Sequence, residues 1–178
     1  MFSKDYINDL KSLHSDKSRS KGFGGKVKSL GSFKRFMTQW YPQYVLDYGC
    51  GKGVMLAHLI DLYPDTNFAG YDPAVHMFNH RPARQYDCVF SNDVLEHIEP
   101  EFIDDVLEDI NSYARYFIWL RIDTKPARKK LPDGRNAHLI IKDEDWWLDK
   151  VSTQIGNIVY TELTEKGKLD IAIEKQNG

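Results

Sequence analysis

The sequence is poor in the residues that would tie it to a secreted, metal-bound or membrane-spanning class. It has only two cysteines among 178 residues, Cys50 and Cys88, too few for the disulfide framework of a small secreted domain. Neither belongs to a metal-binding spacing, so we predict two buried thiols and no metal site. No apolar run approaches the roughly 20 residues that a membrane span needs, and the first residues have no signal-peptide core. We therefore expect a cytoplasmic protein without a membrane partner.

A strong charge of one sign is also missing, because 24 basic and 26 acidic residues leave a net charge of −2. This balance hides two basic segments. Residues 17–35 contain seven Lys or Arg, and residues 121–135 contain six. Such segments are either solvated faces or, if they meet in space, a receptor for an anion.

The remaining composition, 42% hydrophobic and 28% charged, is typical of a soluble globular domain. We expect one domain over residues 1–178, with an N-terminal helical segment over 1–42 and a core over 43–178. Apolar periodicity predicts helices over residues 6–13, 33–41, 54–63, 102–113 and 143–155, strands over 44–48, 67–71, 86–91 and 116–122, and a hairpin over 157–176. Residues 76–79 are ambiguous and could hold one further short strand. The alternation predicts an α/β fold with a mostly parallel sheet and an antiparallel hairpin at or near one edge.

The stretch YVLDYGCGKG, residues 44–53, places three glycines directly after a predicted strand. Gly49 and Gly51 would let the chain turn tightly and let a ligand lie against bare main chain. Gly53 would let the next helix begin close to the sheet, with its free N–H groups facing a polar or anionic group. The pattern DxGxGxG is neither the dinucleotide fingerprint nor a P-loop.

A second acidic residue narrows the kind of ligand. Asp72 ends the second predicted strand, and an acid there can accept hydrogen bonds from two ribose hydroxyls. Together with the glycines, it predicts a nucleotide-type site at the carboxyl edge of the sheet.

Three segments in this order, VLDYGCGKG, YDP and SNDVLEHI, closely resemble the class I S-adenosylmethionine-dependent methyltransferases, in particular the small type 11/12-like branch. The resemblance covers residues 44–122 by motif and the rest by element order. It implies a Rossmann-like fold with a seven-stranded sheet whose last strand is inserted antiparallel. Because residues 72–86 are short for the family's third strand, a six-stranded sheet is the alternative.

The resemblance also implies the cofactor S-adenosyl-L-methionine, its product S-adenosyl-L-homocysteine, and a set of cofactor-binding residues. These are Asp47, Tyr48, Gly49, Gly51, Asp72, Pro73, Asn92 and Asp93. No residue clearly matches the Asp or Asn that often contacts the adenine ring of the cofactor in this family. Asn79 is a weak candidate, and contacts from Pro73, Ala74 and backbone groups are the alternative.

Proton transfer is needed only if the acceptor keeps a proton at the moment of attack. For an O–H or N–H acceptor, we take Asp93 and His97 as the candidate catalytic residues. His138 is a further candidate for proton transfer, whereas Glu96 is equally well explained by the helix dipole. Trp146 and Trp147 are expected to pack rather than to form an aromatic cage.

The family places its N-terminal segment and the loop after its fifth strand over the cofactor, and both are basic here. We therefore predict an anionic small-molecule acceptor that is methylated on O or N, with Lys21, Phe23 and Lys26 closing over the cofactor. The signature of N6-adenine DNA methyltransferases is absent, since SNDV stands in its place. A nucleic-acid or protein acceptor, a protein that only binds or cleaves the cofactor, and a homo-oligomer that completes the site remain alternatives.

Overall fold

The computed structural model describes residues 4–15 and 30–175. In this part of the chain, six strands form one sheet in the order β2-β1-β3-β4-β6-β5. The strands are β1 (Tyr44–Tyr48), β2 (Asn67–Tyr71), β3 (Tyr86–Asn92), β4 (Ala114–Asp123), β5 (Ile158–Leu163) and β6 (Lys168–Glu174). The helices are α1 (Lys4–Ser15), α2 (Phe33–Trp40), α3 (Val54–Leu62), α4 (Ile103–Tyr113) and α5 (Glu144–Gln154), with short 3-10 turns η2 (His76–Phe78), η3 (Leu95–His97) and η4 (Pro100–Phe102).

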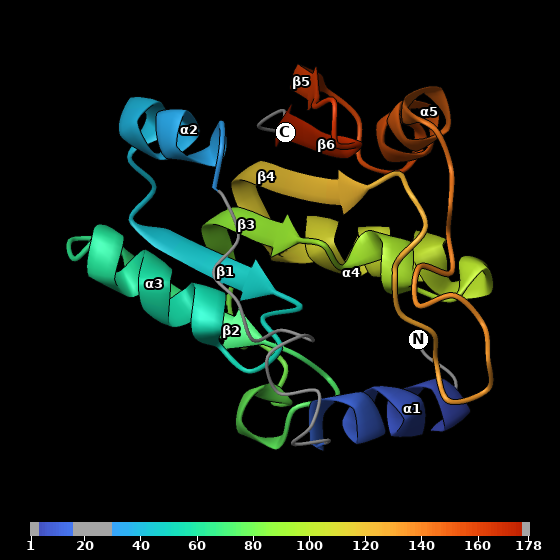
Figure 1. Cartoon of the computed structure of the whole chain (residues 1–178). Helices are drawn as coiled ribbons and strands as arrows, with labels where there is room; N and C mark the ends of the chain where they lie inside the picture. The colour runs from blue at the N-terminus through green and yellow to red at the C-terminus, as the bar shows by residue number, and fades with distance from the viewer. Residues whose placement is uncertain (1–3, 16–29, 176–178) are drawn as a thin grey trace.

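Helices cover both faces of the sheet, as Figure 1 shows: α2 and α3 lie on one face, and α4 and α5 on the other. The strand residues follow this division with a period of two. Val45 and Phe90 pack with α2 and α3, whereas their neighbours Leu46 and Val89 pack with α4 and α5. Trp147 of α5 is fully buried in the second layer, which agrees with the packing role predicted for it.

The strand directions confirm the predicted sheet. Strands β1 to β4 pair in parallel, whereas β6 is antiparallel to both β4 and β5. The C-terminal hairpin therefore inserts its second strand beside β4, which agrees with the antiparallel last strand that the family resemblance implied.

The tentative strand at residues 76–79 is wrong, because this segment forms the 3-10 turn η2. The N–H group of Asp72 donates to the carbonyl of Phe78 at 2.9 Å, and that of Phe78 donates to Val75 at 2.8 Å. Since these bonds close the segment on itself, β2 stays at the edge of the sheet. The sheet described here consequently has six strands rather than seven.

None of the helices in residues 4–15 and 30–175 is long and apolar enough to cross a membrane.

Candidate functional site

The glycine-rich loop between β1 and α3 is fixed to the end of β2. Gly49, Gly51 and Gly53 all have positive φ angles, 81°, 55° and 74°, which glycine adopts without a steric penalty. The N–H group of Gly49 donates to the carbonyl of Tyr71 at 2.7 Å, and that of Gly51 donates to the Oδ2 atom of Asp72 at 2.9 Å. The loop and the predicted ribose-binding acid are therefore one hydrogen-bonded unit.

The structure gives two of these glycines a packing role. A Cβ atom on Gly49 would lie 2.8 Å from Cγ1 of Val94 and closer still to its Cγ2. A Cβ atom on Gly53 would lie 2.8 Å from the ring of Phe78 in η2. The turn that follows β3 and the turn that follows β2 thus both pack against the bare backbone of this loop.

Asp72 is held rigidly at the same edge of the sheet. Its side chain accepts from the N–H groups of Gly51 and Ala74, each at 2.9 Å, and the residue is only 8% exposed. Each carboxylate oxygen has a second lone pair, so these two bonds leave acceptor capacity for hydroxyl groups of a ligand.

Asp47, near the end of β1, is the second buried acid beside the loop. Its Oδ2 atom has no hydrogen-bond partner among residues 4–15 and 30–175. Burial, and then the charge of Asp72, raises the pKa of Asp47 to about 7. A buried carboxylate oxygen without a partner costs free energy, and a ligand group that donates a hydrogen bond or carries positive charge would compensate for this cost.

Without a ligand, Asp47 should make the protein less stable as the pH rises. Its folded pKa lies above the ordinary value near 3.8, so the folded state binds more protons than the unfolded state between about pH 4 and pH 7, and the free energy of unfolding falls across this range by on the order of 3 kcal/mol. Asp47→Asn removes the titration. Urea unfolding at a series of pH values checks this, and an equally steep decline in the variant would assign the pH dependence to other groups.

The end of β3 carries a further predicted site residue, Asp93, in an ion-paired network. Its Oδ1 atom lies 2.9 Å from Nζ of Lys168 on β6, and this Nζ atom lies 2.7 Å from Oδ2 of Asp123 at the end of β4. Lys168 could not be predicted from the sequence, because only the antiparallel insertion of β6 beside β4 brings it to this place. Asn92 precedes Asp93, is half-buried, and lies opposite Arg121 in the sheet register.

Tyr48 contributes its side chain to the fold rather than to the loop. Its hydroxyl donates to Oδ2 of Asp109 on α4 at 2.8 Å, and Asp109 also pairs with Arg81. The prediction that Tyr48 binds the cofactor therefore rests on its main chain. Pro73 is half-buried beside Asp72.

Two histidines that were separate candidates for proton transfer lie side by side. The rings of His97 in η3 and His138 in the loop between β4 and α5 are 4.8 Å apart and nearly perpendicular. Glu96, also in η3, is completely buried. Its burial, and then the charge of Asp93, raises the pKa of Glu96 to about 8.

Helix α1 lies against this group of residues at the carboxyl edge. The hydroxyl of Tyr6, which is 2% exposed, donates to the carbonyl of His97. Leu10 packs against Leu131 and Ala137 of the loop between β4 and α5, and Figure 1 shows α1 beside this loop. Lys21, Phe23 and Lys26 lie outside the described residues, as does most of the basic segment 17–35.

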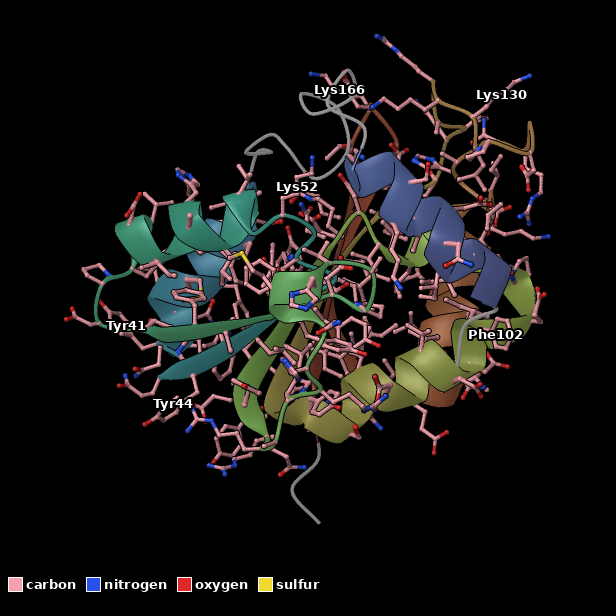
Figure 2. All side chains as sticks on the ribbon, turned by 90° about the horizontal axis from the view of Figure 1, so that it is seen from below. Tyr41, Tyr44, Lys52, Phe102, Lys130 and Lys166 are labelled. Carbon is pink, nitrogen blue, oxygen red and sulfur yellow. The ribbon has the colours of Figure 1, made fainter. Side chains whose placement is uncertain are left out.

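The second basic segment is divided between a structural and an exposed part. Arg121 is 8% exposed and forms a bidentate pair with Asp170, at 2.5 and 2.6 Å, so its charge is neutralised inside the fold. The exposed cations of the segment are Lys125, Arg128, Lys130 and Arg135. In Figure 2, Lys130 lies on the same side of the molecule as Lys52 of the glycine loop and Lys166 of the hairpin.

Comparison with known proteins adds to this geometry. A family model described as "Methyltransferase domain" matches residues 20–155. No curated protein sequence matches the chain.

Solved structures with the same fold include the 1,6-didemethyltoxoflavin-N1-methyltransferase of Burkholderia thailandensis, with bound 1,6-didemethyltoxoflavin and S-adenosylhomocysteine. It is 14% identical with a TM-score of 0.70, over 97% of this chain and 90% of that one. The DhpI–SAH complex is 16% identical with a TM-score of 0.68, over 98% and 100%. The magnesium protoporphyrin IX methyltransferase of Synechocystis PCC 6803, with bound SAM, is 16% identical with a TM-score of 0.62, over 98% and 99%.

Proposed function

The chain belongs to the methyltransferase-domain family and is an S-adenosylmethionine-dependent enzyme, and we propose that it methylates an oxygen or nitrogen atom of an anionic small molecule. The observation that carries the proposal is the arrangement at the carboxyl edge of the sheet. The glycine loop, Asp72 and the end of β3 meet there, beneath α1 and the basic loop that joins β4 to α5.

The residues of the loop fit the cofactor's polar groups. The N–H groups of Gly49 and Cys50 donate hydrogen bonds to the carbonyl of Tyr71, and that of Gly51 donates to the carboxylate of Asp72. The loop therefore offers a ligand its carbonyl oxygens, which suit a cationic ammonium. The unpartnered Oδ2 atom of Asp47 favours a cation at the same place. Asp72, with Pro73 beside it, would accept hydrogen bonds from the ribose.

When bound, S-adenosylmethionine supplies a methyl group already activated by its sulfonium. The task of the protein is therefore to align the acceptor and to exclude water. Asn92 ends β3 and Asp93 follows it, and by the family resemblance both would lie under the methionine part of the cofactor; α1 covers the neighbouring turn through Tyr6. For an O–H or N–H acceptor, we assign proton removal to Asp93, held by Lys168, or to His97.

An anionic acceptor is supported by cations on one side of the molecule. Lys52, which is half-buried, and the exposed Lys130 and Lys166 lie on this side (Figure 2) and come from three different segments, so they do not belong to one helix face. A small acceptor is supported by two structural neighbours, whose names give 1,6-didemethyltoxoflavin and magnesium protoporphyrin IX as substrates.

A methyl-transfer screen tests the proposal directly. Labelled S-adenosylmethionine is supplied with separate pools of small metabolites, RNA, DNA and protein. We expect the label in a small product that binds an anion-exchange resin. Label in RNA, DNA or protein alone would contradict the small-molecule acceptor, and formation of S-adenosylhomocysteine or cleavage products without any labelled acceptor would contradict methyl transfer.

The charge of the acceptor has its own test. Lys130→Glu should raise the KM for the acceptor by about three- to tenfold with little change in kcat, because the charge steers and holds the anion without touching the methyl group. Lys34→Glu, on the distant helix α2, is the matched control and should leave KM unchanged. Equal KM values for the two variants would remove the basic loop from acceptor binding.

The proposal also includes the organisation and the location of the protein. We propose that residues 1–178 act as one domain and that its first 42 residues cover the site. We also propose that the protein works in the cytoplasm. A nucleic-acid acceptor is the alternative partner, and it predicts a steep loss of affinity as the salt concentration rises.

A further inference from the structure

Glu96, His97 and His138 bring three metal-binding side chains together from two segments that are far apart in the sequence. Glu96 and His97 are neighbours in η3, and His138 follows the basic loop. One ligand atom from each residue can be chosen so that all three lie within 4.8 Å of one another. The ligand atoms of a tetrahedral ion at about 2.1 Å are about 3.4 Å apart, so the most distant pair must approach by at most about 1.4 Å, a movement that two side chains can share.

Both imidazole rings are oriented by main-chain carbonyl groups. The Nδ1 atom of His97 lies 2.7 Å from the carbonyl oxygen of Ala137, and that of His138 lies 2.5 Å from the carbonyl oxygen of Lys125. A carbonyl oxygen only accepts, so each Nδ1 carries the proton and each Nε2 carries the lone pair. Histidines that bind metals are commonly held in this way, with one nitrogen donating to a carbonyl and the other facing the ion.

Glu96 supplies an independent observation that points to a ligand. The residue is 0% exposed, and its Oε1 atom accepts from the N–H group of Asp123 at 3.1 Å. Its Oε2 atom is also buried but has no hydrogen-bond partner in the described part of the chain. Leaving such an oxygen unpartnered is costly, whereas coordination to a cation would satisfy it.

We propose that Glu96, His97 and His138 bind one divalent first-row transition-metal ion, with zinc as the experimental probe. Two imidazoles and one carboxylate are a donor set that such ions favour. Three protein ligands leave coordination positions open, and because His97 is only half-buried, water can occupy them. The site is independent of the identity of the methyl acceptor, so it stands even if the proposed acceptor is wrong. A metal ion on Nε2 of His97 would occupy the lone pair that proton removal needs, and would leave that role to Asp93.

Equilibrium dialysis of the chelator-treated full chain against Zn²⁺, followed by metal analysis, tests the site. We expect one tightly bound zinc per chain, with the affinity reduced at least about tenfold in His97→Gln, His138→Gln and Glu96→Gln. His80→Gln, which changes an exposed histidine between β2 and β3, is the matched control and should bind zinc as the wild type does.

A second measurement keeps the test valid if a variant is less stable. Zinc should raise the melting temperature of the wild type and of His80→Gln, but not that of any variant at the three proposed ligands, each compared with its own chelator-treated form. No stoichiometric zinc in the wild type, or the same affinity in His138→Gln as in His80→Gln, would overturn the site and leave adventitious surface binding only.

Discussion

Replacing Gly49 with alanine is expected to lower the free energy of unfolding by about 2 to 4 kcal/mol and to abolish binding of S-adenosylhomocysteine. Two costs add. The residue has a φ of 81°, which a side chain adopts only with strain, and its new Cβ would overlap the side chain of Val94. Relief of that overlap must displace either the glycine loop or the turn after β3, and both belong to the proposed cofactor site.

Two further variants separate these costs, with stability measured by urea unfolding and affinity by calorimetry. Gly156→Ala has the same kind of backbone cost, since its φ is 103° but nothing lies within 4 Å of its Cβ. It should lose only about 1 kcal/mol and retain full cofactor affinity. Val94→Ala combined with Gly49→Ala should recover part of the stability relative to Gly49→Ala alone. Equal stability of Gly49→Ala and Gly156→Ala would contradict the overlap with Val94.

Asp72→Ala is expected to lower the affinity for S-adenosylhomocysteine at least about 30-fold, because it would remove the charge-assisted hydrogen bonds that we propose Asp72 makes to two ribose hydroxyls. It also removes the acceptor for the N–H groups of Gly51 and Ala74, so stability should fall by about 1 to 2 kcal/mol. Calorimetric titration measures the affinity, and circular dichroism at the same temperature confirms that the variant is folded.

The matched control for Asp72→Ala is Asp65→Ala, which removes an exposed carboxylate from the turn between α3 and β2. It should bind the ligand as the wild type does. Similar affinities for Asp72→Ala and the wild type would exclude Asp72 from ribose binding and would leave it only the role of fixing the glycine loop.

The parts of the fold that depend on local sequence were predictable. The alternation of strands and helices along the chain predicted the parallel sheet. The two segments of alternating apolar and polar residues on either side of residues 165–168 predicted the hairpin. The segment at 76–79 was not predictable in this way, because its apolar residues fit a strand equally well. Its structure was decided by the short connection between β2 and β3, which closes through Asp72 and Phe78.

The parts of the site that depend on distant residues could not be found from the sequence. The pairing of Asp93 with Lys168 requires β6 to lie beside β4. The sequence shows Arg121 only as part of a basic segment, and nothing in that segment indicates its buried partner Asp170. The same limitation hid the proximity of His97 to His138, since their contact depends on how the long basic loop returns to η3.

The central claim is that the glycine loop and Asp72 form the binding site of a methyl-transfer cofactor. Calorimetric titration of S-adenosylhomocysteine into the wild-type chain tests it most directly. We predict one binding site per chain with a dissociation constant below about 100 μM, equivalent to more than about 5 kcal/mol of binding free energy. The absence of binding by the folded wild-type protein at saturating ligand would contradict the claim.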